Sequence, residues 1–156
     1  MVNPDVSNPS ASNGDALVVV AIDGPAGSGK STVAKLLAEA VGLPYLDTGA
    51  MYRAVTFAVL SRGLDPADSP RLPDVASDVE LRLEPDGTVM VDGADVTIEI
   101  RGPEVTRAVS SVAADPGVRR ELVSRQREWV RRRGGGVLEG RDIGSVVFPD
   151  ARLKVY

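Results

Sequence analysis

Apolar residues follow two different spacings near the start of the chain. Residues 17–22 read Leu-Val-Val-Val-Ala-Ile, a continuous and mostly β-branched run that is typical of a strand buried on both faces of a parallel sheet. After a glycine-rich loop, apolar residues recur at helical spacing from Lys30 until Gly42 and Pro44 mark a stop. The apolar positions of this predicted helix are Val33, Leu36, Leu37, Ala40 and Val41. The pattern predicts a strand, a loop and a helix in succession.

A second unit of the same kind follows directly. Residues 44–46 form a short predicted strand. Residues 48–60 form a predicted helix, and its apolar positions Met51, Val55, Ala58 and Val59 share one side. Two strand-and-helix units in a row favour an α/β fold built on a parallel sheet.

The middle of the chain breaks this alternation. Residues 63–74 are rich in proline and aspartate, which predicts a loop or linker at an insertion point. Residues 79–83 and 89–91 then alternate apolar and polar positions around the turn residues 85–87, which predicts an inserted antiparallel β-hairpin.

The last part of the chain returns to helices and strands. Residues 104–114 and 118–133 are predicted as two helices separated at Asp115-Pro116, because proline ends one helix and suits the first turn of the next. The glycines at 134–136 are expected to break the chain before a short strand at 137–138, and residues 152–156 begin another strand. No internal repeat is visible in the sequence.

Composition narrows the function classes. The 156 residues are 43% hydrophobic and 26% charged, as in a soluble globular domain, here expected over residues 16–156 after a flexible tail at residues 1–15. The net charge of −4 offers no overall positive field for a nucleic acid. Cysteine and histidine are absent, which excludes disulfides, thiolate metal sites and imidazole-based catalysis. The longest apolar run is too short for a membrane span and no signal-peptide pattern begins the chain, so we expect a cytoplasmic protein without a membrane partner.

The glycine-rich loop carries the clearest chemical signal. Residues 24–31 match GxxxxGK[ST] in full, between a predicted buried strand and a predicted helix. In such a P-loop the backbone amides wrap phosphate oxygens, Lys30 reaches the outer phosphates and the Ser31 hydroxyl can ligate Mg²⁺. The expected ligand is a nucleoside triphosphate. The residues expected to bind it are Gly24, Pro25, Ala26, Gly27, Ser28, Gly29, Lys30, Ser31 and Thr32.

Two further segments lie where predicted strands end. Residues 47–53 read Asp-Thr-Gly-Ala-Met-Tyr-Arg, and residues 139–144 read Glu-Gly-Arg-Asp-Ile-Gly. Both are expected at the carboxyl edge of the sheet, where open α/β folds bind their ligands. Each combines an arginine, Arg53 or Arg141, with hydroxyl or carboxylate groups. Either arginine alone is equally well explained as an ion-paired surface residue, but together they favour a second phosphate-bearing ligand.

These motifs, together with IRGPEVTRAVSSVAADPGVRRELVSRQRE and LEGRDIGSVVFPDA, occur in an order and spacing that resemble the bacterial cytidylate kinases. The resemblance covers roughly residues 17–156 and implies the nucleoside-monophosphate-kinase version of the P-loop fold. It also implies an insertion at residues 63–133 that binds the monophosphate. The implied reaction transfers the γ-phosphoryl group of ATP to CMP or dCMP with Mg²⁺.

The resemblance also implies roles for individual residues. The family positions that hold the CMP phosphate correspond to Thr48, Arg53 and Arg141. Those that contact the cytosine correspond to Ser110, Arg119 and Asp142. The residues implied to act in catalysis are Lys30, Arg53, Glu139 and Arg141, with Glu139 expected to position the metal and phosphate rather than to act as a strong base.

Structural alternatives remain open for several of these residues. Ser110 is equally compatible with a small residue packed on a helix, and Asp142 with a helix cap or an ion-pair partner of Arg119. Two further arginines, Arg125 and Arg127, and the run at residues 131–133 are expected on a solvated helix face.

Alternatives of function remain open as well. One is a P-loop kinase acting on an alcohol, of the shikimate or gluconate type, and another is a nucleotide-binding fragment without turnover. The bacterial family continues beyond the segment that ends here, with a lid, further substrate contacts and a last strand and helix. We therefore expect this chain to be a truncated member with uncertain activity and an exposed sheet edge that favours self-association. The full-length protein is expected to be a monomer.

Overall fold

The structure is a computed structural model and describes residues 16–156. The predicted tail at residues 1–15 lies outside the described residues. In chain order the elements are β1 (Val18–Asp23), α1 (Lys30–Val41), β2 (Tyr45–Asp47), α2 (Thr48–Ser61), α3 (Leu72–Asp78), β3 (Leu81–Leu83), β4 (Val89–Val91), β5 (Ala94–Asp95), the 3-10 helix η1 (Glu99–Arg101), α4 (Pro103–Ala114), α5 (Pro116–Arg133), β6 (Gly135–Gly140), the π-helical turn η2 (Ile143–Val147) and β7 (Leu153–Val155).

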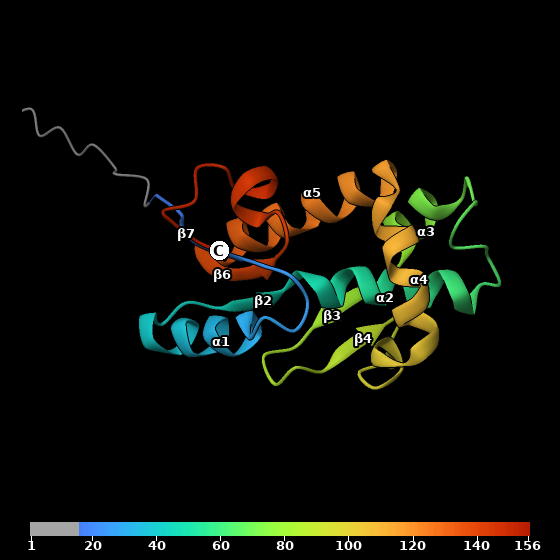
Figure 1. The fold of residues 1–156 in the computed structure, drawn as a ribbon, viewed down its shortest axis with the longest axis horizontal. Coiled ribbons are helices and arrows are strands. Elements are labelled where there is room, and N and C mark those ends of the chain that lie inside the picture. The colour runs from blue at the N-terminus through green and yellow to red at the C-terminus, as the bar shows by residue number, and fades with distance from the viewer. Residues whose placement is uncertain (1–15) are drawn as a thin grey trace, which may run out of the picture.

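The main sheet is parallel and has the strand order β2-β6-β1-β7. Alternate residues of its strands point to opposite sides, because side chains of a strand alternate between the two faces. On one face, Val20, Ile22 and Val137 pack against α1. On the other face, Val19 and Leu138 join the larger core that contains α2 and α5. The sheet is therefore covered on both faces, with α1 and α5 on opposite sides in Figure 1.

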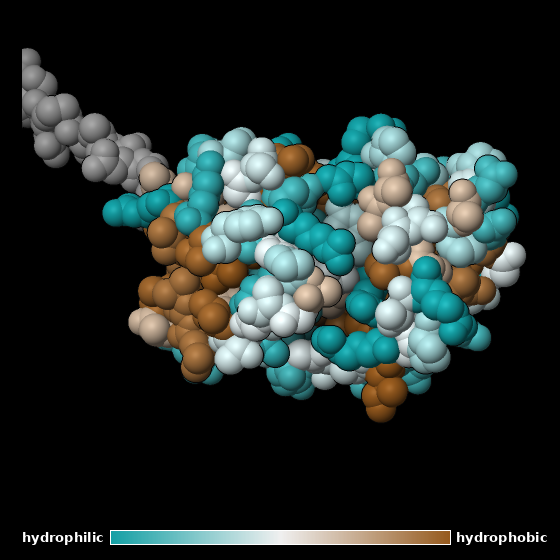
Figure 2. Space-filling model, viewed as in Figure 1, coloured by the Kyte–Doolittle hydropathy of each residue, from teal (hydrophilic) through white to brown (hydrophobic). Residues whose placement is uncertain are grey.

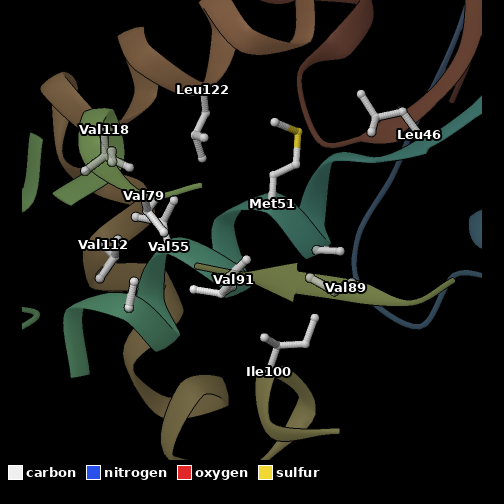
Figure 3. Close-up of a cluster of buried hydrophobic side chains, with 14 of the residues drawn as sticks. Leu46, Met51, Val55, Val79, Val89, Val91, Ile100, Val112, Val118 and Leu122 are labelled. Carbon is white, nitrogen blue, oxygen red and sulfur yellow. The ribbon is translucent and has the colours of Figure 1, made fainter. Parts of the chain in front are cut away.

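A second, antiparallel sheet has the order β3-β4-β5 and contains the predicted hairpin. Its strand β4 packs against α2, which is buried along most of its length. Figure 3 shows the shared core, in which Met51 and Val55 of α2 lie among side chains from β4, η1, α4 and α5. The expected α/β architecture, with a parallel sheet and an inserted hairpin, is confirmed.

The predicted bounds of α1 are correct, but its predicted apolar face is wrong. The buried residues of α1 are Ala34 and Ala38, whereas Leu36 is 62% exposed and Val33 and Val41 are about half exposed. Small residues let the helix approach the β-branched sheet face closely. Of the predicted apolar positions, only Leu37 packs against this core, partly buried, and the others are exposed.

Two predicted irregular segments are regular in the structure. The predicted loop at residues 63–74 contains the start of α3, whose Leu72 and Val75 are buried and whose Pro73 lies in the first turn, where proline is tolerated. The predicted break at residues 134–136 contains the first two residues of β6. A Cβ on Gly135 would lie 2.5 Å from the carbonyl oxygen of Val18, so β1 and β6 approach closely there because glycine has no side chain.

The predicted solvated arginine face of α5 is also partly wrong. Arg125 donates to the backbone carbonyls of Val79 (2.9 Å) and Ser77 (2.8 Å), and it pairs with Glu121. Arg127 donates to the carbonyl of Val147 at 3.0 Å. These two arginines connect α5 to α3 and η2. Arg125 is half-buried, whereas Arg127 and residues 131–133 are exposed as expected.

One end of the molecule carries exposed apolar side chains. They gather where α1 and β7 lie (Figure 2) and include Leu36, Val41, Leu153 and Val155. Strand β7 is an edge strand of the sheet, as expected from the sequence. Within residues 16–156, no helix combines the length and apolar character that a membrane crossing requires.

Candidate functional site

A cavity of about 480 Å³ opens at the carboxyl ends of β1, β2 and β6. This edge of a parallel sheet is where α/β folds place their ligands. The cavity wall comes from the loop after β1, the first turns of α1 and α2, the η1 turn, the last turns of α4, the start of α5 and the segment after β6. It is lined by Ala26, Gly27, Lys30, Ser31, Asp47, Thr48, Gly49, Ala50, Tyr52, Arg53, Arg101, Val109, Ser110, Ala113, Ala114, Arg119, Glu139, Gly140, Arg141 and Asp142.

The loop between β1 and α1 is shaped for an anion. Gly27 and Gly29 have φ of 76° and 83°, left-handed values that glycine adopts without strain. Among residues 16–156, no side chain caps the amino end of α1, and the first turn of the helix holds no acidic residue. The first amide groups of the helix therefore stay available, and the positive end of the helix dipole favours a phosphate there. Lys30 Nζ lies 3.0 Å from the carbonyl oxygen of Pro25, across the loop.

Glu139 is a buried residue held by three hydroxyl groups, two on its carboxylate and one on its backbone carbonyl. Its side chain is 2% exposed, although it lies at the end of β6 beside the loop. Ser31 Oγ donates to Glu139 Oε2 at 2.7 Å, and the Tyr45 hydroxyl donates to Glu139 Oε1. Thr48 Oγ1 donates to the backbone carbonyl of Glu139, also at 2.7 Å. The three donors come from α1, β2 and α2, so Glu139 connects all three elements beneath the loop.

Cationic side chains outnumber anionic ones around the cavity. Its wall contains five cations, from Lys30, Arg53, Arg101, Arg119 and Arg141, and three carboxylates. In a chain with a net charge of −4, this is a local concentration of positive charge. Such a wall favours a ligand with several negative charges.

Arg119 and Asp142 form an ion pair at the far end of the cavity. Arg119 lies in the first turns of α5, and its guanidinium donates to the Asp142 carboxylate after β6. The hydrogen bond to Asp142 raises the pKa of Arg119 further. Tyr52 of α2 lies beside the pair, and burial raises its pKa, so its phenol stays protonated. The structural alternative for Asp142, an ion pair with Arg119, is thus realised inside the cavity wall.

The remaining arginines of the cavity wall differ in their contacts: Arg53 and Arg101 have protein partners, and Arg141 has no ion-pair partner among residues 16–156. Arg53 donates to the carbonyl oxygen of Ile100 at 3.1 Å and to Thr106 Oγ1 at 3.0 Å, so it connects α2 with the segment around η1. Arg101 lies 3.9 Å from Asp47. Arg141 is exposed, and within residues 16–156 no carboxylate lies within ion-pair distance of it.

Most of the predicted site residues meet in this one cavity. Its wall contains these predicted residues: Ala26, Gly27, Lys30, Ser31, Thr48, Arg53, Ser110, Arg119, Glu139, Arg141 and Asp142. The other predicted residues of the loop lie outside the wall: Gly24, Pro25, Ser28, Gly29 and Thr32. Gly24 instead donates its amide to the carbonyl of Gly140 at 3.2 Å, which connects the loop to the end of β6.

Sequence reasoning assigned no role to several residues that the structure places here. Asp47, Tyr52 and Arg101 line the cavity, and Tyr45 contacts Glu139. Asp47 and Tyr52 lie inside the strand-end segment 47–53, and the position of that segment at the end of a predicted strand is the signal that could find them. Nothing local in the sequence indicates that Tyr45 meets Glu139, 94 residues away.

Asp23 at the end of β1 is a further residue without a predicted role. Its two carboxylate oxygens accept the amides of Ile143 and Gly144, each at 2.8 Å. These bonds hold the start of η2, and the residues directly before it are Arg141 and Asp142.

The oxygen donors beside the loop fit one kind of metal. Within residues 16–156, no group of three or more acidic, histidine or cysteine side chains forms a metal cage. Ser31 Oγ and Glu139 Oε2 lie 2.7 Å apart next to the anion-binding amides. Mg²⁺ takes oxygen ligands, keeps several waters and is commonly held by one or two protein groups plus phosphate. The donor set fits Mg²⁺ that arrives with a nucleotide.

The parallel sheet, the glycine-rich loop and the uncapped helix that follows it define a P-loop protein of the α/β class. Comparison with known proteins narrows this class. The family model described as cytidylate kinase matches residues 20–156. The chain belongs to the cytidylate kinase family.

Individual relatives agree with this assignment. The chain is 54% identical over 142 residues to a cytidylate kinase of Mycobacterium avium (strain 104), a match that covers 89% of this chain and 62% of that protein. It is 52% identical over 139 residues to a cytidylate kinase of Solibacter usitatus (strain Ellin6076), covering 89% and 59%. It is 55% identical over 145 residues to a bifunctional pantoate ligase/cytidylate kinase of Synechococcus sp. (strain JA-2-3B'a(2-13)), covering 88% and 26%. The chain thus spans about three-fifths of the cytidylate kinases and about a quarter of the bifunctional protein.

Proposed function

We propose that this chain carries the catalytic site that transfers the γ-phosphoryl group of ATP to CMP or dCMP, giving ADP and CDP or dCDP. The observation that carries the proposal is the cavity in which a P-loop faces four arginines, one of which, Arg119, is paired with Asp142. Membership of the cytidylate kinase family supports the same reaction.

The triphosphate is proposed to bind at the loop and the amino end of α1. The free amides of the loop and of the first turn of α1 surround its phosphate oxygens, and Lys30 contacts the outer phosphates. Ser31 and Glu139 would hold Mg²⁺, which neutralises charge on the phosphates when bound. Glu139 acts here by position, since its two carboxylate oxygens already accept hydrogen bonds from Ser31 and Tyr45.

The acceptor nucleotide is proposed to occupy the opposite part of the cavity. Thr48, Arg53 and Arg141 hold its phosphate, because guanidinium groups match phosphate geometry in bidentate contacts. Ser110, Arg119 and Asp142 contact the cytosine. A carboxylate that accepts a hydrogen bond from the exocyclic amine of cytosine favours it over uracil, which has an acceptor at that position.

This arrangement suits phosphoryl transfer. The transition state is loose and spreads charge over the equatorial oxygens, so catalysis depends on alignment and nearby positive charge rather than on proton abstraction. Lys30, Arg53 and Arg141 supply that charge from α1, from α2 and from the segment after β6, all in one cavity wall. The number of cations in the wall favours a phosphate acceptor over an alcohol such as shikimate or gluconate.

The same proposal covers the domain organisation, the location and the partners of the protein. Residues 16–156 are proposed to belong to one kinase domain, in which residues 63–133 bind the monophosphate. The protein is proposed to act in the cytoplasm, as a monomer when full length, without a nucleic acid or a membrane as partner.

The test is ADP formation from Mg-ATP by the purified chain with CMP, dCMP, UMP or no acceptor. We expect turnover with CMP and dCMP, little with UMP, and a loss of roughly a hundredfold or more in Lys30→Ala, which removes a charge at the transferring phosphoryl group. Lys154→Ala is the matched control, because Lys154 lies on β7 outside the cavity, and it should retain turnover. Phosphorylation of an alcohol instead of CMP would overturn the proposal, and equal use of CMP and UMP would overturn the base assignment.

A further inference from the structure

Glu139 lies in a setting that a carboxylate rarely occupies without a cation. It is 2% exposed, and among residues 16–156 no lysine or arginine lies within ion-pair distance of it. The nearby Lys30 donates to the carbonyl of Pro25 instead. Two hydroxyl donors, from Ser31 and Tyr45, therefore compensate the burial of this charge.

The register of the sheet explains how Tyr45 reaches Glu139. In the β2–β6 pair, Asp47 lies opposite Glu139 and Tyr45 lies opposite Val137. Residues two apart on a strand share a face, so Tyr45 and Glu139 point to the same side, toward α1. The long phenol side chain spans the diagonal between the two positions. The Tyr45 ring packs with the apolar cluster between α1 and the sheet, and Lys35 Nζ lies 5.6 Å from its centre.

Each of the two hydroxyls donates to one oxygen of the Glu139 carboxylate. The terminal torsion of a glutamate side chain is soft, so the carboxylate plane rotates unless both oxygens are held. Tyr45 takes Oε1, which leaves Oε2 directed at Ser31, the hydroxyl beside the anion-binding amides. A phenol hydroxyl donates one hydrogen bond, and a carboxylate only accepts, so Tyr45 is the donor of this pair.

We propose that Tyr45 is a positioning residue for magnesium-dependent nucleotide binding: its hydroxyl fixes Oε1 of Glu139 so that Oε2 and the Ser31 hydroxyl are aligned before Mg²⁺ arrives. The inference rests on the proposed function, because it takes the ligand of the loop to be a magnesium nucleotide. Tyr45 acts through Glu139 and lies outside the cavity wall.

The test compares nucleotide affinity with and without Mg²⁺, and turnover is not needed. Calorimetric titration with ADP, in Mg²⁺ and in EDTA, gives the factor by which Mg²⁺ strengthens binding. In Tyr45→Phe, we expect affinity in EDTA to stay within twofold and the Mg²⁺ factor to fall by about five- to tenfold, as for the loss of one hydrogen bond to a charged group. Tyr45→Leu, which also lacks the hydroxyl but keeps an apolar side chain, should lose the same factor.

A double-mutant cycle separates this role from packing. In the Glu139→Gln background the charged carboxylate is gone, so adding Tyr45→Phe should leave the Mg²⁺ factor unchanged. If the wild-type chain binds ADP and the Tyr45→Phe variant keeps the whole Mg²⁺ factor, the inference is overturned and the proposed function is not. An equal loss on adding Tyr45→Phe in both backgrounds would also overturn it. A wild-type chain that binds no nucleotide in either buffer would overturn the proposed function together with the inference.

Discussion

Asp23 should contribute stability well beyond that of an ordinary surface aspartate. Its two carboxylate oxygens accept the amides of Ile143 and Gly144 at 2.8 Å each, and the side chain is only partly exposed. Hydrogen bonds to charged groups contribute roughly 1.5–3 kcal/mol each. In Asp23→Asn the amide oxygen keeps one bond, whereas the amide NH₂ faces the second N–H and leaves it without an acceptor. We expect a loss of about 2–3 kcal/mol of unfolding free energy, which lowers the melting temperature by roughly 5–10 °C for a domain of this size.

Two measurements test this prediction. Urea unfolding gives the free energy, and amide hydrogen exchange should show faster exchange at Ile143 and Gly144 than in the wild type. The matched control is Asp86→Asn, because Asp86 also accepts a backbone amide, that of Thr88 at 2.9 Å, but is fully exposed. The control should leave unfolding unchanged. The reasoning is refuted if Asp23→Asn unfolds like the control and protects both amides as well as the wild type does.

Three further outcomes follow from packing and burial. A Cβ on Gly136 would lie 2.6 Å from the ring of Trp129, so Gly136→Ala should cost about 1–3 kcal/mol in urea unfolding, and an unchanged midpoint would contradict the close approach. Leu36 is 62% exposed, so Leu36→Ser should change the unfolding free energy by no more than about 0.5 kcal/mol. A loss several times larger would indicate that Leu36 is buried, as its helical spacing predicts. Burial raises the pKa of Tyr45 and of Tyr52 above the ordinary value of 10.0. Both phenols hold their protons more tightly when folded, so their contribution to stability should be constant below pH 10.0 and fall as the pH rises past it; thermal melts from about pH 9 to 11 that show no fall would contradict this.

Local sequence was sufficient for the elements that carry the loop. The β-branched run at residues 17–22 and the full GxxxxGK[ST] match predicted β1, the loop and the bounds of α1, and the structure has all three. These signals are local because strand burial, glycine conformations and helix stops depend on residues close together in the chain. The hairpin at β3 and β4 was predictable for the same reason, since its turn residues and its alternation lie within a dozen positions.

Tertiary contacts decided which predicted faces and breaks are real. Gly135 and Gly136 look like a chain break by composition, yet they belong to β6 because they pair with β1, in a place where neighbouring backbone and the Trp129 ring leave no room for a Cβ. Arg125 looks solvated by its place in a charged helix, yet it donates to carbonyls at the end of α3. Val18 and the carbonyls of Ser77 and Val79 lie far along the chain from the residues they contact, so local pattern carries no record of these partners.

The candidate site also has a part that the sequence predicts and a part that only the fold reveals. The sequence by itself determined the P-loop, the strand-end segments with Arg53 and Arg141, and through family resemblance the other residues expected to line one cavity. Only the folded chain showed that Tyr45, Ser31 and Thr48 converge on Glu139, and that Asp23 holds the turn after Arg141 and Asp142. The physical reason is that a parallel sheet aligns strands distant in sequence side by side, so the bonds that position a site form between segments that no local spacing relates.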